Sequence, residues 1–306
     1  MAERDEWLAR VATIKQWRRD GMRAPHKPLL ILYALAQLQR QGASAVRFAD
    51  AEPALKEVLA EFGPPATRPT PQYPFVRLAN DGLWTVDTDD GSEPGENVGQ
   101  LRASGATGRF VPELEEALLA DPGLAALVAH TVLDAEWQDS LHDDICQRVG
   151  LDLTGLEVAA ARERVVELGE RRRRRDPAFR VVVLTAYEYR CAMCGYDGRI
   201  GTEAVALEAA HVRWWTHDGP DDVANGLCLC SLHHKLLDRG VLGVTAEHTV
   251  AVSRNFVGHS ETARRHVLDL AGRELLDPQP GLPTPADEHI GWHTTQVFRA
   301  PARRSA

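Results

Sequence analysis

Residues 191–194 read Cys-Ala-Met-Cys, and residues 230–234 read Cys-Ser-Leu-His-His. Each segment places two zinc-binding residue types three positions apart, and tetrahedral zinc sites use thiolate and imidazole ligands. Cys228 is a competing ligand, but Cys230 repeats the spacing of the first pair. A closed site with four protein ligands leaves no position for water or substrate, so its expected role is structural. The predicted ligands are Cys191, Cys194, Cys230 and His233.

The cysteine count and the first residues of the chain bear on the compartment. The chain has five cysteines, and its first twenty residues carry several charges in place of an apolar export signal. Metal binding is therefore favoured over a disulfide framework, with buried unliganded cysteines as the alternative. Cys146 stands alone and is expected in a core. No apolar run is long enough to cross a bilayer, so we expect a cytoplasmic protein with no membrane partner.

The length and the residue patterns indicate two domains. A chain of 306 residues is long enough to bury two separate cores. Residues 28–42 begin with proline and end with glycine around an apolar run, which is typical of a buried helix. Residues 75–79 and 83–86 are β-prone and flank Asn-Asp-Gly, which predicts a hairpin. The fold class is α+β. Further helices are expected at 112–120, 122–133, 140–149 and 289–298.

Three more polar residues lie between and beside the predicted zinc ligands. They are His211 in Leu-Glu-Ala-Ala-His, Asn225 in Ala-Asn-Gly-Leu, and His234 directly after His233. The ordered set of CxxC, His, Asn and CxxH-His resembles the HNH nuclease family over residues 181–251. The resemblance implies a ββα-metal fold and a metal-dependent deoxyribonuclease.

The resemblance also implies a role for each residue of this set. His211 is the expected general base, and the ordinary pKa of histidine, about 6.5, suits proton abstraction at neutral pH. His234 is the expected ligand of a catalytic Mg²⁺ or Mn²⁺ ion. Asn225 is expected to orient its loop and to fix the imidazole of His211 through its amide. The alternative role for Asn225 is that of a turn residue.

The sequence departs from the HNH pattern directly before the base. Many family members carry an acidic residue or histidine there as a metal ligand, whereas this chain has Ala210. Side chains alternate along a strand, so Glu208 shares a face with Ala210 and is the predicted replacement ligand. Asp238, four residues after His234 on a helix, is the competing candidate.

The first half contains residues suited to DNA, although the formal net charge of −9 requires any basic surface to be local. His26 and Lys27 precede Pro28 at the start of a helix, where an anion is favoured. A capping turn is the alternative. The other expected DNA contacts are Tyr73, Pro74, Phe75, Arg102 and Ser104, with Phe75 turned more to the core.

Four motifs in one order carry a second resemblance. They are His-Lys-Pro-Leu-Leu at 26–30, Tyr-Pro-Phe at 73–75, Asn-Asp-Gly-Leu-Trp at 80–84 and Ser-Leu-His-Asp-Asp-Ile at 140–145. This order resembles the DNA sulfur-binding domain of phosphorothioation-dependent McrA-type restriction endonucleases. The resemblance implies recognition of duplex DNA carrying a phosphorothioate linkage. Sulfur is larger, more polarizable and a poorer hydrogen-bond acceptor than oxygen, so an apolar cup would select it.

The expected organisation follows from both resemblances. We expect a sulfur-binding reader domain at residues 1–153, a linker helix at 154–177, and an HNH nuclease domain with a C-terminal extension at 178–306. The basic run 171–175 in the linker suits either the DNA backbone or a solvated helix end.

Two alternatives and the oligomeric state stay open. A nuclease of this architecture that reads a modified base such as methylcytosine would need an aromatic cage, to which Trp84 is a candidate contributor. A non-catalytic zinc-containing DNA-binding module would not need His211, Asn225 and His234. A homodimer would allow one HNH site to cut each strand.

Overall fold

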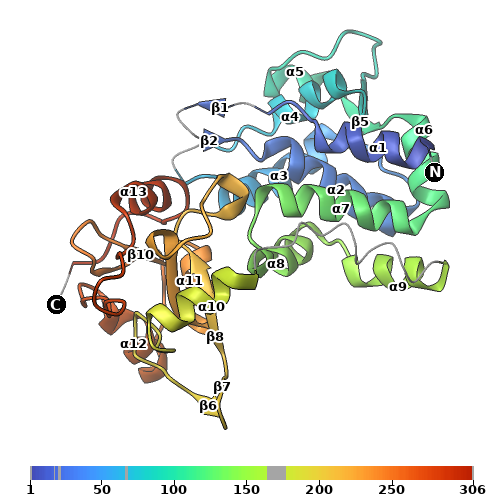
Figure 1. The fold of residues 1–306 in the computed structure, drawn as a ribbon. Coiled ribbons are helices and arrows are strands. Elements are labelled where there is room, and N and C mark those ends of the chain that lie inside the picture. The colour runs from blue at the N-terminus through green and yellow to red at the C-terminus, as the bar shows by residue number, and fades with distance from the viewer. Residues whose placement is uncertain (1, 17, 20–21, 66–67, 164–176, 305–306) are drawn as a thin grey trace. The chain divides into compact units, whose positions relative to one another are not determined.

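A computed structural model describes residues 2–16, 18–19, 22–65, 68–163 and 177–304. The chain divides into two compact units, Met1–Arg172 and Arg173–Ala306. Figure 1 shows the elements of both units in chain order from blue to red. Within the described residues, no single helix is both long and apolar enough to cross a membrane, and one pair of helices, Pro112–Ala120 and Pro122–Glu136, passes that test only jointly and with a 112° bend.

The first unit is mainly helical, with one small sheet. Its helices are α1 (Ala2–Ala12), α2 (His26–Gln41), α3 (Phe48–Phe62), α4 (Gln72–Arg77), η1 (Leu78–Asp81), α5 (Val98–Ala103), α6 (Pro112–Ala120), α7 (Pro122–Glu136), α8 (Asp139–Val149) and α9 (Leu153–Glu163). Its strands are β1 (Arg18–Arg19), β2 (Met22–Arg23), β3 (Val46–Arg47), β4 (Trp84–Asp87) and β5 (Thr107–Phe110).

The core of the first unit forms around α2. All residues from Pro28 to Leu32 are buried, and Gly42 ends the helix with a left-handed φ of 70° that glycine adopts without strain. Helix α2 packs against α7, which also contacts α1 and α9 (Figure 1). The expected helix at 28–42 and those at 112–120, 122–133 and 140–149 are confirmed.

The hairpin predicted at residues 75–86 does not form, although its second segment is a strand. Residues 84–87 form β4, which pairs with β5 in a three-stranded sheet of order β3-β5-β4. Residues 75–79, however, belong to α4 and η1. Phe75 and Leu78 are both fully buried and lie three positions apart, so a helical turn puts both into the core, which an extended strand would not do. Phe75 packs edge-on against Phe48 and Trp84.

The second unit is built on a strand pair and two helices. Its helices are α10 (Pro177–Ala186), η2 (Trp215–His217), η3 (Val223–Asn225), α11 (Ser231–Asp238), α12 (Glu261–His266), η4 (Leu268–Leu270) and α13 (Asp287–Gln296). Its strands are β6 (Arg199–Ile200), β7 (Glu203–Ala204), β8 (Leu207–His211), β9 (Gly226–Cys230), β10 (Leu242–Val244) and β11 (Val250–Val252).

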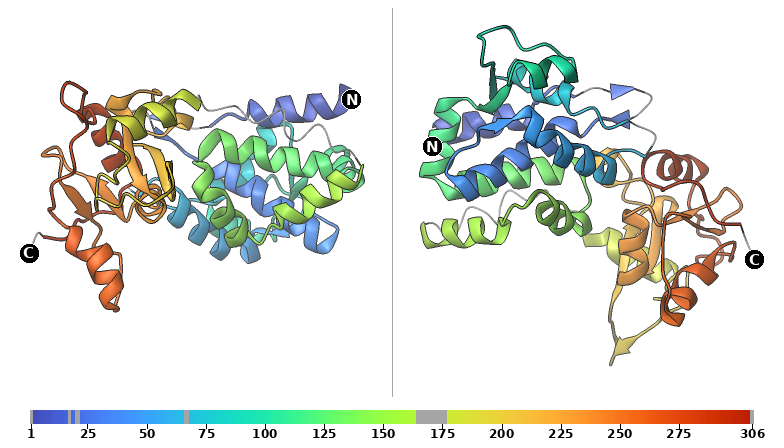
Figure 2. Two further views of the ribbon diagram at one scale, coloured as in Figure 1. Left: turned by 60° about the horizontal axis from the view of Figure 1, so that its bottom comes forward. Right: turned by 180° about the vertical axis from the view of Figure 1, so that it is seen from behind.

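Strands β8 and β9 pair antiparallel, with His211 opposite Gly226 and Leu207 opposite Cys230. Helix α11 follows β9 directly and packs on both strands, and α10 packs on them as well. The buried side chains of β9 and α10 belong to one hydrophobic core. Figure 1 and the right-hand view of Figure 2 show the short β6–β7 ribbon extending away from the body of this unit. The expected C-terminal helix is confirmed as α13, which packs against β10.

The expected linker helix is described only in part. Helix α9 covers Leu153–Glu163, and residues 164–176 lie outside the described residues. The basic run 171–175, which suits either the DNA backbone or a solvated helix end, lies outside the described residues.

Candidate functional site

The four predicted zinc ligands converge on one point. The ligand atoms of Cys191, Cys194, Cys230 and His233 all lie within 4.8 Å of one another. Cys191 and Cys194 belong to the turn after α10, Cys230 ends β9, and His233 lies in the first turn of α11. The Sγ atoms of Cys191 and Cys230 are 3.4 and 3.3 Å from Nδ1 of His233.

The donor set and its surroundings fit a tetrahedral cation. Nε2 of His233 donates to the carbonyl of His266 at 2.8 Å, which leaves Nδ1 toward the sulfur atoms, and ligating histidines are oriented in this way. The neighbouring Cys194 thiol lowers the pKa of Cys191, which favours a thiolate. Cys228 is outside the cluster. Its thiol is buried in the core, and burial raises its pKa to about 12.

His211 ends β8 and is held on two sides. Its ring stacks on Phe179 of α10, with centroids 4.0 Å apart and planes 14° from parallel. Its Nε2 lies 2.6 Å from Oδ1 of Asp221. A side chain at Gly226, the partner of His211 across the strands, would approach Val183 to 2.4 Å and the Phe179 ring to 3.4 Å. The absence of a side chain there lets α10 bring Phe179 onto the imidazole.

Asn225 closes the loop between β8 and β9. Its Oδ1 accepts from the backbone N–H of Arg213 at 2.7 Å, and its Nδ2 donates to the carbonyls of Arg213 at 2.9 Å and Pro220 at 3.0 Å. A Cβ at Gly219 would lie 1.9 Å from the Arg213 carbonyl oxygen, so only glycine fits where the two ends of this loop approach each other. The expectation that the Asn225 amide fixes the His211 imidazole is corrected. Both donors of Nδ2 and one acceptor site of Oδ1 are used by the backbone of the loop.

His234 lies between the two candidate acidic ligands. Its Nδ1 is 2.5 Å from Oε2 of Glu208, and its Nε2 is 3.3 Å from Oδ2 of Asp238. The contact with His234, aided by the Ser231 hydroxyl, lowers the pKa of Glu208 to about 2. Glu208 is partly exposed and Asp238 is buried. An imidazole flanked by carboxylates is a donor set that accepts Mg²⁺ or Mn²⁺.

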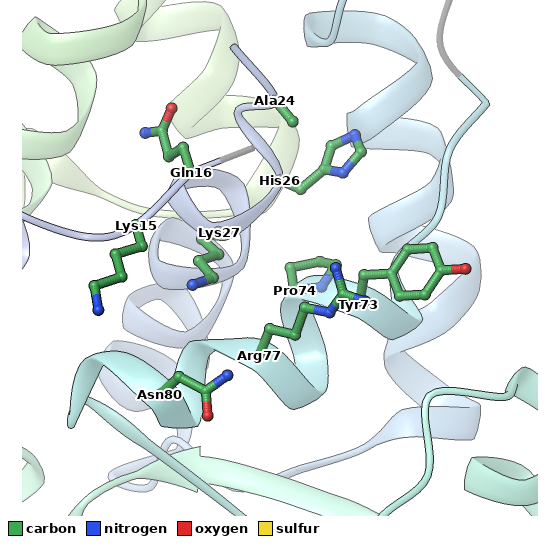
Figure 3. A pocket seen from close by; sticks show the side chains of 9 residues that line it. All are labelled: Lys15, Gln16, Ala24, His26, Lys27, Tyr73, Pro74, Arg77 and Asn80. Carbon is green, nitrogen blue, oxygen red and sulfur yellow. The ribbon is translucent and has the colours of Figure 1, made fainter. Parts of the chain in front are cut away.

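The first unit has a pocket of about 290 Å³ at the starts of α2 and α4. Figure 3 shows Tyr73, Pro74 and Arg77 of α4 on one side of it and residues of α2 and its preceding segment on the other. His26 is largely buried, which lowers its pKa to about 4 and keeps it neutral at pH 7. The lining residues are Lys15, Gln16, Ala24, His26, Lys27, Tyr73, Pro74, Arg77 and Asn80.

Two of the cations at this pocket, Lys27 and Arg77, are paired with carboxylates. Nζ of Lys27 donates to Asp81 at 2.5 Å, and the two side chains are only 12% and 4% exposed. Arg77 donates two hydrogen bonds to Glu96, at 2.5 and 2.6 Å, and its guanidinium lies 4.7 Å from the centre of the Tyr73 ring. Glu96 raises the pKa of Arg77. The pocket therefore combines an aromatic and proline wall with two cations, Lys27 and Arg77, whose charges are offset by carboxylates.

Two protein families match the sequence of the regions that hold these sites. Residues 4–154 match the ScoMcrA-like DNA sulfur-binding domain, and residues 191–245 match the HNH endonuclease family. The chain joins a DNA sulfur-binding domain to an HNH endonuclease domain. Both parts of the predicted family assignment are confirmed.

Three solved structures are similar to parts of this chain. The "Sulfur binding domain of SprMcrA complexed with phosphorothioated DNA" is 23% identical, with a TM-score of 0.42, over 48% of this chain and 94% of that chain. The corresponding ScoMcrA structure is 22% identical, with a TM-score of 0.41, over 49% and 97%. The "Modification dependent TagI restriction endonuclease" is 25% identical, with a TM-score of 0.30, over 40% and 38%. No curated protein matches this chain.

The sulfur-binding domain gathers four of its seven predicted DNA contacts at the pocket, namely His26, Lys27, Tyr73 and Pro74. Phe75 is fully buried, so its assignment as a DNA contact is corrected to a core residue. Arg102 pairs with Glu52 at 2.7 Å, and neither Arg102 nor Ser104 lines the pocket.

Sequence reasoning missed residues in both domains. In the HNH domain it missed Asp221 and Phe179, which come from outside the motif and meet His211 only in the folded chain. In the sulfur-binding domain it missed Arg77, which lies four residues after Tyr73. That spacing would have pointed to it if the segment had been assigned to a helix. It also missed Lys15, Gln16, Ala24 and Asn80.

Proposed function

We propose that this chain is a type IV-like restriction endonuclease that recognises phosphorothioate-modified duplex DNA and hydrolyses phosphodiester bonds near the modification. The observation that carries the proposal is that one chain contains both domains. The sulfur-binding domain has a pocket walled by Tyr73 and Pro74, and the HNH domain has His211, Asn225 and His234. The proposed limits are 1–153 for the reader, 154–177 for the linker and 178–306 for the nuclease domain.

The pocket supports selection of sulfur by its walls. Tyr73 and Pro74 offer apolar surface that a large, weakly accepting sulfur atom can contact without losing strong hydrogen bonds. Neutral His26 can donate one N–H to a neighbouring phosphate oxygen without attracting every phosphate by charge. The apolar wall then discriminates sulfur from oxygen, and the polar residues position the DNA backbone.

The HNH domain supports hydrolysis as a ββα-metal nuclease. His211 takes a proton from a water molecule whose oxygen attacks phosphorus, and the bond from phosphorus to the leaving oxygen breaks. A Mg²⁺ or Mn²⁺ ion held by His234 and Glu208, with Asp238 as the alternative carboxylate, would stabilise charge on the phosphoryl and leaving oxygens. Zn²⁺ is the proposed occupant of the Cys191, Cys194, Cys230 and His233 site. Asn225 holds the loop between the strands.

A modified-base reader has less support. Trp84, its candidate aromatic residue, is 2% exposed and packs between Phe75 and Phe110 in the core. A homodimer that cuts both strands and a cytoplasmic location stay proposals.

The test compares one duplex with and without a single phosphorothioate linkage of each stereochemistry. Wild-type protein should bind one modified duplex more tightly and cleave it in Mg²⁺ or Mn²⁺. His211→Ala should stay folded and keep the binding preference but lose cleavage by about 100- to 10,000-fold. Equal affinity for all duplexes would reject sulfur recognition. Normal cleavage by His211→Ala would reject the assignment of the base.

A further inference from the structure

The contact between Asp221 and His211 has a specific geometry. Oδ1 of Asp221 is 2.6 Å from Nε2, and the side chains of Asp221 and His211 are 22% and 2% exposed. The Phe179 ring limits tilting of the imidazole, and the hydrogen bond to Asp221 sets its rotation about the side-chain bonds. Together these two contacts define the position of the ring.

The loop holds Asp221 in place independently of His211. Asn225 anchors the carbonyl of Pro220, the residue directly before Asp221. Asp222, the residue directly after it, accepts from the backbone N–H of Asn225 at 3.0 Å and is the N-cap of η3. The residues on both sides of Asp221 are therefore held by hydrogen bonds with Asn225. These bonds keep the Asp221 carboxylate against the imidazole of His211.

We propose that Asp221 is a positioning residue for the general base His211. Its carboxylate accepts the Nε2 proton and so leaves the lone pair of the imidazole at Nδ1, where it takes the proton of the attacking water. When His211 becomes an imidazolium, the carboxylate stabilises the new positive charge. The inference rests on the proposed nuclease function and adds a residue outside the HNH motif.

The charges around His211 determine in which direction a substitution of Asp221 shifts the pH dependence of cleavage. Asp221 is the carboxylate in contact with the ring, Asp222 is engaged as a cap, and Arg180 of α10 donates to the carbonyl of Leu207 at 2.9 Å. Removing the negative charge of Asp221 disfavours the imidazolium and lowers the pKa of His211. The acidic limb of a rate profile that depends on neutral His211 then moves to lower pH.

The test is a pH–rate profile of the full chain on phosphorothioated duplex DNA in Mg²⁺ or Mn²⁺. Asp221→Asn should lower the maximal cleavage rate on the order of 100-fold and move the acidic limb down by about one pH unit. Asp221→Glu should restore part of the rate and the original limb. Asp222→Asn, which loses the same charge one residue away but keeps an acceptor for the cap, should leave the limb in place.

A second readout does not need cleavage. In the DNA-free protein with its zinc site filled and no Mg²⁺ or Mn²⁺ added, ¹⁵N chemical shifts should show His211 protonated at Nε2 in the wild type and a mixture of tautomers in Asp221→Asn.

Each result separates the two claims. A wild-type protein that cleaves no duplex would reject the proposed function. A wild type that cleaves, with His211→Ala inactive and Asp221→Asn unchanged in rate, limb and tautomer, would reject the role of Asp221. Faster cleavage by Asp221→Asn would also overturn it, because the carboxylate would then be blocking the base.

Discussion

The pocket of the sulfur-binding domain and the polar centre of the HNH domain place ionisable groups in different ways. In the HNH domain, histidines contact thiols or carboxylates: His233 belongs to the cluster of possible metal ligands, and His234 contacts Glu208. In the sulfur-binding domain, the cations Lys27 and Arg77 are already paired with Asp81 and Glu96. The first arrangement suits the metal ions that we propose for the HNH domain, whereas in the second the charges of two cations are offset and aromatic and proline surface is left for contact.

The largest expected effect tests whether only one of these regions depends on a metal. Cys191→Ser should unfold the HNH domain, because zinc binding to such a site contributes about 10 kcal/mol or more to folding. Residues of the sulfur-binding domain should keep their protection from hydrogen exchange. A zinc chelator should have the same effect on the wild type. Conversely, Cys146→Ser, at a buried thiol far from the cluster in sequence, should leave zinc content at one per chain. Equal zinc content in Cys191→Ser and wild type would contradict the site.

The next effect concerns Lys27, which the sequence assigns to a DNA contact or to a capping turn. Lys27→Met should lower the free energy of unfolding of the sulfur-binding domain by about 3 to 5 kcal/mol, since it leaves the buried Asp81 without its cation. Urea unfolding would measure this loss. Adding Asp81→Asn should recover part of it. If Lys27→Met instead unfolds like the wild type and weakens only DNA binding, the pair is not structural and the contrast between the domains fails.

A smaller effect tests the apolar wall. Tyr73→Ala should reduce the ratio of affinities for phosphorothioated and ordinary duplex by about 5- to 30-fold, because it removes a contact that sulfur uses better than oxygen, worth roughly 1 to 2 kcal/mol. Fluorescence titration of both duplexes would give the ratio. Arg102→Ala, outside the pocket, is the matched control and should keep the ratio. A Tyr73→Ala variant that loses affinity for both duplexes equally would assign Tyr73 to general binding.

The smallest effect concerns the exposed pair at the pocket. Glu96→Gln should release Arg77, which stacks on Tyr73, for contact with a phosphate. We expect tighter binding of both duplexes by only a few-fold, because exposed ion pairs contribute about 0 to 1 kcal/mol. The slope of log affinity against log salt should become steeper by about one phosphate contact. Unchanged slope and affinity would mean that Arg77 does not reach DNA.

Local patterns were enough to predict much of the fold. The proline start, apolar run and glycine end of α2 predicted its limits, and the spacing of four zinc-binding residues predicted one cluster. The segment at 75–79 was assigned wrongly, because its β-prone residue types agreed with a strand while the burial of Phe75 and Leu78 required a helical turn. Residue type is a weak guide where tertiary packing selects the conformation.

The sequence by itself determined the chemistry that each domain can offer, because ligand types, their order and their short spacings are properties of the chain. Only the tertiary structure decided which groups meet. Asp221 reaches His211 because Asn225 closes a loop, and Phe179 arrives from a separate helix over Gly226. It also decided that Lys27 is held by Asp81, 54 residues away. Such contacts depend on distances in space, which residue order alone does not fix.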